Sequence, residues 1–302
     1  MRTEWKNQSL IINFHYVRDT QGFFAITKNM FSKMITSLKK THDIICLDDI
    51  SIRNQIKPFC ILTFDDGLSD HYEFVFPLLQ KFGIKATFFP STLPITKPVV
   101  LNTHIIHLLL AKIGKEDLAK LLSQCFEKRS INIDLYDYSS PLFFNKWADP
   151  LLSNIKKSLK DLNLLVSREI LIELLTQYLG EEEKISKKFY FQREQIEKMN
   201  KAGMNFGLHG HQHIPLAELS YDEKYREMNK SKEILAKFCD SINSIAYPFG
   251  SYDNETKKIA SELNIRFGLT IRENSFNLLS YDNLQLPRYD AFTVAKRFGY
   301  TQ

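Results

Sequence analysis

The sequence predicts an α/β fold with parallel strands, built either as an open sheet or as a barrel. Short apolar runs of strand length alternate with helical patterns through most of the 302 residues, and this alternation is typical of strand–helix–strand units. Several runs are apolar throughout rather than at every second position, as expected of parallel strands buried on both faces. With 44% hydrophobic residues, the chain can bury a substantial core, which excludes an intrinsically disordered protein.

The expected strands are short and are separated by turn residues or helical segments. In chain order they are Leu10–Phe14, Ile44–Leu47, Phe59–Phe64, Ile84–Phe89, Asn205–Leu208, Ser244–Tyr247, Phe267–Thr270 and Leu284–Leu286.

Between these runs, apolar residues recur at the spacing of one buried helix face. Thr27 can cap the first such helix, because its side-chain oxygen can accept a backbone hydrogen bond from the first turn. The apolar stripes are formed by Phe31, Met34, Ile35 and Leu38, by Tyr72, Val75, Phe76 and Leu79, by Ile234, Leu235 and Phe238, and by Ile259, Ala260 and Leu263.

The segment from about 100 to 190 interrupts the alternation with helical stripes and no convincing strand. The stripes run through Leu118–Cys125, Leu152–Leu162 and Ile170–Tyr178, and residues 132–150 between them are loop-like. We interpret the segment as a helical insertion into a single domain that spans residues 1–302. Its apolar stripes must be buried, and self-association through the insertion is one way to bury them.

Composition excludes several classes of protein. The 40 basic and 35 acidic residues leave a net charge of +5, whereas a dedicated nucleic-acid binder concentrates basic charge on one face. The four cysteines lie far apart without a CxxC pair, so we expect neither a disulfide scaffold nor a cysteine-ligated zinc site. No signal-peptide pattern is visible, and no apolar run approaches the ~18 residues of a membrane helix. We therefore expect a cytoplasmic protein without a membrane span.

Two adjacent carboxylates, Asp65 and Asp66, directly follow the apolar run Phe59–Phe64. One interpretation is a simple turn, in which Gly67 supplies a permissive backbone. The other is a catalytic pair. Adjacent side chains of an extended segment point in opposite directions, so the two carboxylates can take different roles.

Three histidines, His209, His211 and His213, follow the expected strand Asn205–Leu208. They can form an exposed polar loop, or they can bind a metal through neutral imidazole rings. Two histidines and one carboxylate would make a three-ligand site with positions left open for water and substrate, as a catalytic zinc ion requires. A second carboxylate that does not bind the metal could then deprotonate the water.

These motifs resemble those of the polysaccharide deacetylase (NodB-homology) family, carbohydrate esterase family 4. The resemblance lies in Thr63–Gly67 (TFDDG), Gly83–Phe89, His209–His213 (HxxxH) and Ala246–Tyr252. It implies a distorted (β/α)7-type barrel, whose active site would lie at the carboxyl ends of the strands. It also implies metal-dependent removal of N-acetyl groups from an amino sugar.

The resemblance assigns roles residue by residue. Asp65 is implied as the catalytic base, and the implied ligands of a divalent metal, usually Zn²⁺, are Asp66, His209 and His213. Tyr247 and Phe249 are implied to wall the substrate groove, with the Phe249 amide helping to hold the oxyanion. His211 matches no catalytic position of the family pattern; we interpret it as a solvated loop residue, with a role beside the metal ligands or in the substrate groove as the alternative.

Two residues of the family pattern are missing. The arginine that orients the base is replaced by Ala246, and no histidine follows His213 to protonate the leaving amine. The chain is similar to a subset of the family, the poly-N-acetylglucosamine deacetylases of biofilm systems, in which an N-terminal strand ends in a Tyr-His pair. His15 is therefore the candidate general acid, although a strand-end histidine with only structural contacts fits as well.

Arg288 is the candidate for the missing guanidinium, although it could equally pair with a surface carboxylate. The sequence thus predicts a metal-dependent hydrolase that removes N-acetyl groups from an amino sugar, as a glycan or a glycan precursor. Two alternatives remain open. One is a carbohydrate-binding pseudoenzyme of the same fold, and the other is a metal-dependent hydrolase of a non-sugar amide.

Overall fold

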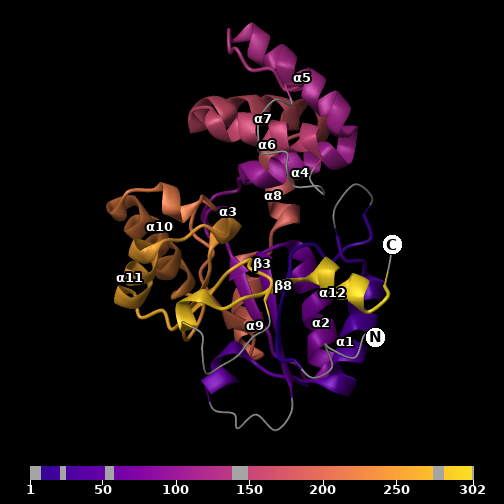
Figure 1. The fold of residues 1–302 in the computed structure, drawn as a ribbon, viewed down its shortest axis with the longest axis vertical. Coiled ribbons are helices and arrows are strands. Elements are labelled where there is room, and N and C mark those ends of the chain that lie inside the picture. Colours follow the sequence, from indigo (N-terminus) through magenta and orange to yellow (C-terminus); the bar gives the residue numbers. More distant parts are fainter. Residues whose placement is uncertain (1–7, 21–24, 52–57, 138–148, 275–281, 301–302) are drawn as a thin grey trace. The chain divides into compact units, whose positions relative to one another are not determined.

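The computed structural model describes residues 8–20, 25–51, 58–137, 149–274 and 282–300. The chain forms two compact units (Figure 1). The first comprises residues 1–19, 24–97 and 187–302, and the second comprises residues 20–23 and 98–186. The predicted organisation as a single domain over residues 1–302 stays a prediction.

The first unit is an α/β structure in which all pairings between the strands named below are parallel. This confirms the predicted fold class. The strands are β1 (Leu10–Phe14), β2 (Asp43–Ile44), β3 (Phe59–Asp66), β4 (Thr87–Pro90), β5 (Asn205–Phe206), β6 (Ser244–Ala246), β7 (Phe267–Leu269) and β8 (Tyr289–Asp290). Six of them form one sheet in the order β5-β4-β3-β1-β8, with β2 beside the start of β3, and β6 pairs with β7 in a second sheet.

The centre of the larger sheet is β3, whose eight residues are all buried. Along its length it pairs with β1, from Leu10↔Cys60 to Phe14↔Phe64. Its carboxyl end pairs with β4, where Asp66 lies opposite Pro90. Neighbours flank β3 on both sides up to Phe64, and its last two residues, Asp65 and Asp66, pair with β4 alone.

Two isolated parallel bridges continue the pairing between the sheets. Leu208, just after β5, bridges to Ile245 of β6, and Leu269 of β7 bridges to Leu286, just before β8. This arrangement is consistent with a distorted barrel, although the strand ladders themselves end within the two sheets.

The prediction of a strand at Leu284–Leu286 is wrong. Residues Asn283–Gln285 form a short 3₁₀ turn, and the last strand begins only at Tyr289. The Asp282 carboxylate accepts the Leu284 N–H at 2.8 Å, which stabilises a turn over a strand. Pro287 then has no N–H to donate to a sheet.

Helices cover the strands of the first unit. They are α1 (Lys28–Thr41), α2 (Phe76–Phe82), α3 (Leu93–Thr96), α9 (Arg193–Lys201), α10 (Tyr221–Leu235), α11 (Asn254–Glu262) and α12 (Ala291–Arg297). In Figure 1, α1, α2 and α12 lie on one side of the strands, and α10 and α11 lie on the other. As predicted, Thr27 caps α1 by accepting the Met30 N–H at 3.1 Å, and the predicted stripe of that helix is buried.

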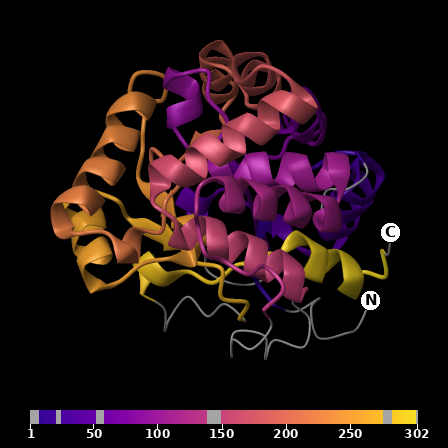
Figure 2. The same ribbon diagram turned by 90° about the horizontal axis from the view of Figure 1, so that it is seen from above.

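The second unit is helical in its described residues and has a hydrophobic core of its own. It contains α4 (Asn102–Ile113), α5 (Lys115–Lys128), α6 (Pro150–Asp161) and α7 (Leu164–Leu179), while α8 (Glu182–Phe189) spans the boundary between the units. Helix α4 packs against α5 and α7, and α6 packs against the same two helices (Figure 2). The helical stripes predicted there are confirmed, since Leu118, Ile155 and Leu171 are buried at the helix contacts. Most of the predicted loop 132–150 lies outside the described residues.

Across the described ranges, no helix is both long enough and apolar enough to cross a membrane.

Candidate metal centre and active site

The carboxyl end of β3 makes an abrupt turn at its two aspartates. Asp65 and Asp66 are the last residues of the strand and are 1% and 4% exposed. Asp66 has φ 75° and Gly67 has φ 71°, so two successive residues adopt the left-handed conformation that favours glycine. A side chain at position 67 would also collide with Pro90, because an added Cβ would lie 2.7 Å from the Pro90 Cβ. The absence of a side chain at Gly67 lets the chain leave the sheet directly after the carboxylates.

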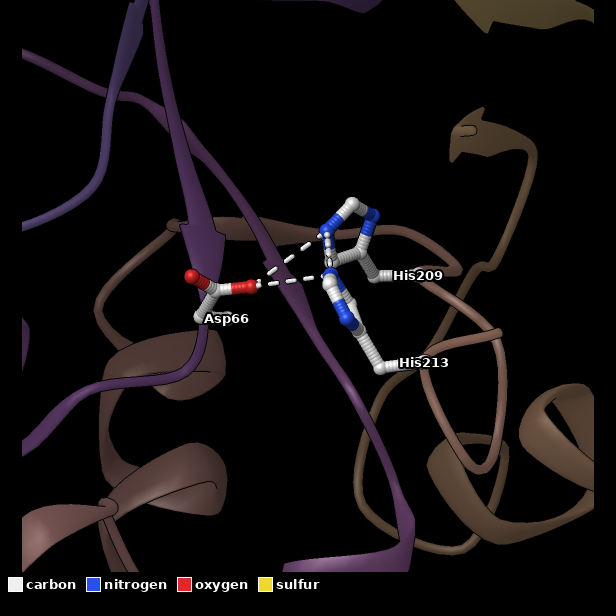
Figure 3. Close-up of side chains that lie close together, drawn as sticks. All are labelled: Asp66, His209 and His213. Atoms are coloured by element: carbon white, nitrogen blue, oxygen red, sulfur yellow. Dashed lines mark hydrogen bonds and ion pairs between the residues drawn. The ribbon is translucent and has the colours of Figure 1, made fainter. Parts of the chain in front are cut away.

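Asp66, His209 and His213 meet at this edge of the sheet, and Figure 3 shows their side chains pointing toward one another. The Asp66 Oδ1 atom lies 3.4 Å from His209 Nε2 and 3.3 Å from His213 Nε2. The two Nε2 atoms are 3.2 Å apart. All three side chains are nearly inaccessible to solvent, so the three potential ligand atoms meet where they are largely shielded from water.

This donor set fits a divalent cation. Tetrahedral ligands about 2.0–2.1 Å from a zinc ion stand about 3.3–3.4 Å apart, and the three separations match that spacing. The His209 Nδ1 atom lies 2.7 Å from the Ala246 carbonyl oxygen. A carbonyl can only accept a hydrogen bond, so Nδ1 carries the proton and Nε2 presents its lone pair to the cluster. Three ligands leave a coordination position open, while the set alone does not select one metal.

The charges around His209 also favour a bound cation. Burial lowers the pKa of this imidazole, but the neighbouring carboxylates of Asp65 and Asp66 outweigh burial, and the pKa of His209 is raised. The site therefore favours a positive charge at the imidazole, and a bound cation would meet the same demand.

Asp65 pairs with Arg288 and is not a member of the cluster formed by Asp66, His209 and His213. Two parallel hydrogen bonds of 2.8 Å join Arg288 Nη1 and Nη2 to the two carboxylate oxygens, and both side chains are buried. The remaining guanidinium contacts are Nε to the Thr270 carbonyl at 3.0 Å, and Nη1 to Asn13 Oδ1 and Thr63 Oγ1, each at 3.2 Å. Arg288 therefore lies against the candidate base rather than a surface carboxylate.

This pairing keeps Asp65 ionised. Burial raises the pKa of the carboxyl, but the Arg288 charge, the His209 charge and the Arg288 hydrogen bonds together hold it below its ordinary value. The two aspartates thus have different partners, Asp66 in the metal cluster and Asp65 in a bidentate pair with an arginine.

His15 lies at the open side of Asp65. Its Nε2 atom is 4.0 Å from Asp65 Oδ2, and 40% of its side chain is exposed. Its position is fixed by a residue that sequence reasoning missed, because the His71 Nε2 atom lies 2.6 Å from the His15 carbonyl oxygen. Burial lowers the pKa of His71 despite the raising effect of Asp70, so His71 is neutral and donates this bond. No local pattern distinguishes His71 from a surface histidine.

The turn after β6 places its two aromatic residues differently. Tyr247 is fully buried, its hydroxyl donates to the Leu284 carbonyl at 3.0 Å, and its ring stacks on Tyr252 at 4.7 Å. Burial raises the pKa of Tyr247. Phe249 is 50% exposed, and its ring centroid lies 4.6 Å from that of His213. Of these two rings, only that of Phe249 can face a substrate.

His211 stands outside the metal cluster. It is half-buried, and its Nδ1 atom is 2.9 Å from Thr92 Oγ1. It is therefore a bonded residue of the loop and not the solvated histidine that the sequence indicated.

Comparison with known proteins identifies a family to which the sequence belongs. The family model described as polysaccharide deacetylase matches residues 53–119 and 174–268, together more than half of the chain. A search of curated proteins finds no significant match.

Several solved structures share the fold. The deacetylase PplD of Streptococcus pyogenes, solved in complex with acetate, is 19% identical with a TM-score of 0.58, and the match covers 94% of this chain and 92% of that one. IcaB from Ammonifex degensii is 14% identical with a TM-score of 0.61, over 98% of both chains. The BpsB deacetylase domain from Bordetella bronchiseptica is 17% identical with a TM-score of 0.55, over 94% of this chain and 96% of that one. At these identities the structures show a common fold, and on the evidence of the family match the chain belongs to the polysaccharide deacetylase family.

Proposed function

We propose that the protein is a metal-dependent hydrolase that removes N-acetyl groups from an amino sugar, in a glycan or a glycan precursor. One observation carries the proposal: consecutive residues of β3 bring an arginine-paired carboxylate, Asp65, and a three-ligand cluster around Asp66 to the same point. Amide hydrolysis at a metal site needs both a base and a ligand cluster. The acetate bound to PplD is the product that such a reaction releases.

Each step has a candidate residue. A divalent cation held by Asp66, His209 and His213 would lower the pKa of a coordinated water from 15.7 towards ~7 and polarise the acetyl carbonyl. Asp65 accepts a proton from the attacking water, and because both of its oxygens bond Arg288, the carboxylate is held in one orientation.

His15 is the proposed general acid. Its exposed ring beside Asp65 can protonate the amine nitrogen as the C–N bond breaks, and the His71 hydrogen bond holds its backbone in place. The water oxygen joins the acyl carbon, so the products are acetate and a free amino sugar. Phe249, exposed beside His213, offers a flat apolar surface for a sugar ring.

The alternative of a carbohydrate-binding pseudoenzyme arises from the two residues missing from the family pattern. Arg288 comes from another part of the chain than the missing arginine, but its two hydrogen bonds to Asp65 support a role in orienting the base. His15 lies where an acid can act. We therefore favour the enzyme over the pseudoenzyme.

The test is acetate release from N-acetylated sugars by the zinc-loaded protein and by its Asp65→Asn variant. The variant should lose turnover and still bind one metal ion by elemental analysis, while a matched change at the exposed Asp222 (Asp222→Asn) should leave turnover intact. Unchanged turnover in Asp65→Asn would remove Asp65 as the base. Sugar binding by the wild type without acetate release would favour the pseudoenzyme.

The acetate-release assay should include substrates other than cell-wall polymer. A cytoplasmic location remains a prediction, and a protein in that compartment would meet nucleotide-linked or lipid-linked amino sugars before cell-wall polymer. These precursors belong beside the polymer in the assay. Acetate release from non-sugar amides alone would identify the third candidate, an amide hydrolase of another substrate class.

A further inference from the structure

The loop that carries the two histidine ligands is held by other parts of the chain. Residues 209–213 form no helix or strand, and both Gly210 (φ 71°) and His213 (φ 57°) have left-handed backbones. For a histidine this conformation costs free energy, so it persists only where surrounding contacts impose it.

The carbonyl groups of the loop bond to the segment that follows β4. Ser91 Oγ donates to the His209 carbonyl at 3.0 Å. The next two backbone N–H groups, of Thr92 and Leu93, donate to the carbonyls of residues 210 and 211 at 3.2 and 2.8 Å. These three bonds fix one edge of the loop.

One carboxylate on α10 bonds to the backbone of the loop. Glu227 accepts the backbone N–H of Gln212 at 2.5 Å, and the nearby backbone N–H groups of His211 and His213 lower the pKa of its carboxyl. A Cβ added to Gly210 would lie only 3.0 Å from Glu227 Oε1. The loop therefore wraps closely around this carboxylate.

Glu227 is an unusual residue to bury. It is 5% exposed, and no ion pair with a lysine or arginine forms at it within the described part of the chain. A buried carboxylate without a cationic partner costs free energy unless several donors satisfy it. At Glu227 the bonded donor is the Gln212 N–H, and the backbone N–H groups of the loop offset only part of the burial that raises the pKa of this carboxyl.

Helix α10 fixes the position of the Glu227 carboxylate. Ser220 and Glu223 cap the helix reciprocally, which fixes where it begins. Glu227 follows one turn after Glu223, on a face that is buried together with Met228 and Ser231. The carboxylate is therefore placed by a helix, whereas the loop has no regular structure of its own.

We propose that Glu227 is a positioning residue that holds the His209–His213 loop with both imidazole Nε2 atoms at the spacing a cation needs. The inference rests on the proposed metal site and extends it to a residue outside the ligand set. Partners that orient metal ligands typically change metal affinity by about 10–100-fold when they are replaced.

The experiment measures zinc affinity on the full-length, metal-free protein by competition with a chromophoric chelator. Glu227→Leu removes the acceptor and should weaken zinc binding about 10–100-fold. Glu227→Gln keeps a side-chain oxygen that can accept the N–H groups, so it should lose clearly less affinity than Glu227→Leu. Glu233→Gln, at an exposed position of the same helix, is the matched control and should bind zinc as the wild type does.

Two further measurements separate positioning from general stability. The urea midpoint of each metal-free variant reports folding, and the visible spectrum of the cobalt-substituted protein reports ligand geometry. We expect an altered cobalt spectrum in Glu227→Leu, with partial recovery in Glu227→Gln. If Glu227→Leu does not fold, the shorter Glu227→Asp decides in its place, because it withdraws the carboxylate from the loop by one methylene. Wild-type zinc affinity and an unchanged cobalt spectrum in Glu227→Asp would overturn the proposal.

The outcomes also distinguish this inference from the proposed function. If the wild type binds no divalent metal, the proposed function fails and this inference fails with it. If the wild type binds zinc and releases acetate while Glu227→Leu binds zinc equally well, only the role of Glu227 is overturned.

Discussion

The buried pair between Arg288 and Asp65 allows a quantitative prediction. Arg288 is 1% exposed, and its guanidinium makes five hydrogen bonds, two of them to Asp65. The change Arg288→Met keeps a long apolar side chain and removes all five bonds. Asp65 then remains buried without its main counter-charge.

The expected loss of unfolding free energy depends on whether the buried Asp65 stays charged or takes up a proton. Removing one partner of a buried ion pair typically costs about 3–5 kcal/mol of unfolding free energy. The carboxyl can limit the loss by taking up a proton. At pH 7, protonating a carboxyl with an ordinary pKa of about 3.9 costs about 4 kcal/mol, since each pKa unit corresponds to about 1.4 kcal/mol. We therefore expect Arg288→Met to lose about 3–4 kcal/mol at pH 7.

The assay is urea unfolding in the presence of a chelator, applied to the wild type, Arg288→Met, Asp65→Asn and the double variant. Asp65→Asn in the Arg288→Met background removes the stranded charge, so the double variant should be more stable than the sum of the single losses indicates. The expected interaction free energy is about 1–3 kcal/mol, within the range for residues in direct contact. Losses that add to within about 0.5 kcal/mol would refute the reasoning, because the two charges would then be independent.

Three further predictions concern the other residues of the site. Replacing His15 by Gln should lower acetate release about 10²–10⁴-fold, the usual contribution of a general acid, without changing zinc affinity in the chelator assay; a matching loss of zinc affinity would contradict the acid role. Zinc at about 100 times its Kd should raise the unfolding free energy of the wild type by about 2.7 kcal/mol, and Asp66→Ala should abolish this increase in a urea titration. Burial lowers the pKa of His71 in the folded state, so below about pH 6.5 the unfolded chain binds more protons than the folded one, and stability falls as the pH drops. His71→Gln keeps a donor for the His15 carbonyl and should flatten the decline in unfolding free energy between pH 7 and 5; equal slopes in variant and wild type would show that His71 does not titrate as argued.

Much of the fold and the core of the candidate site could be predicted because their signals are local. The apolar run Phe59–Phe64 predicted β3, which extends two residues further to Asp66, and the Thr27 cap predicted the start of α1. Such features depend on residues within a few positions of one another, which a pattern can register. The prediction of a strand at Leu284–Leu286 was wrong, although the signals there are local too. The Asp282 cap and Pro287 favour a turn and outweigh the apolar run.

The sequence by itself identified the groups of the candidate site: two adjacent carboxylates and a spaced histidine pair, each at or just after the end of a strand. Only the tertiary structure decided which charges meet. Arg288 stands 223 positions from Asp65 in the sequence, and Glu227 meets the histidine loop through the backbone N–H of Gln212, which carries no sequence signal. The strength of such contacts depends on how far both partners are removed from water. Burial is a property of the whole fold, so local patterns could nominate Arg288 only as a candidate and could not reveal Glu227.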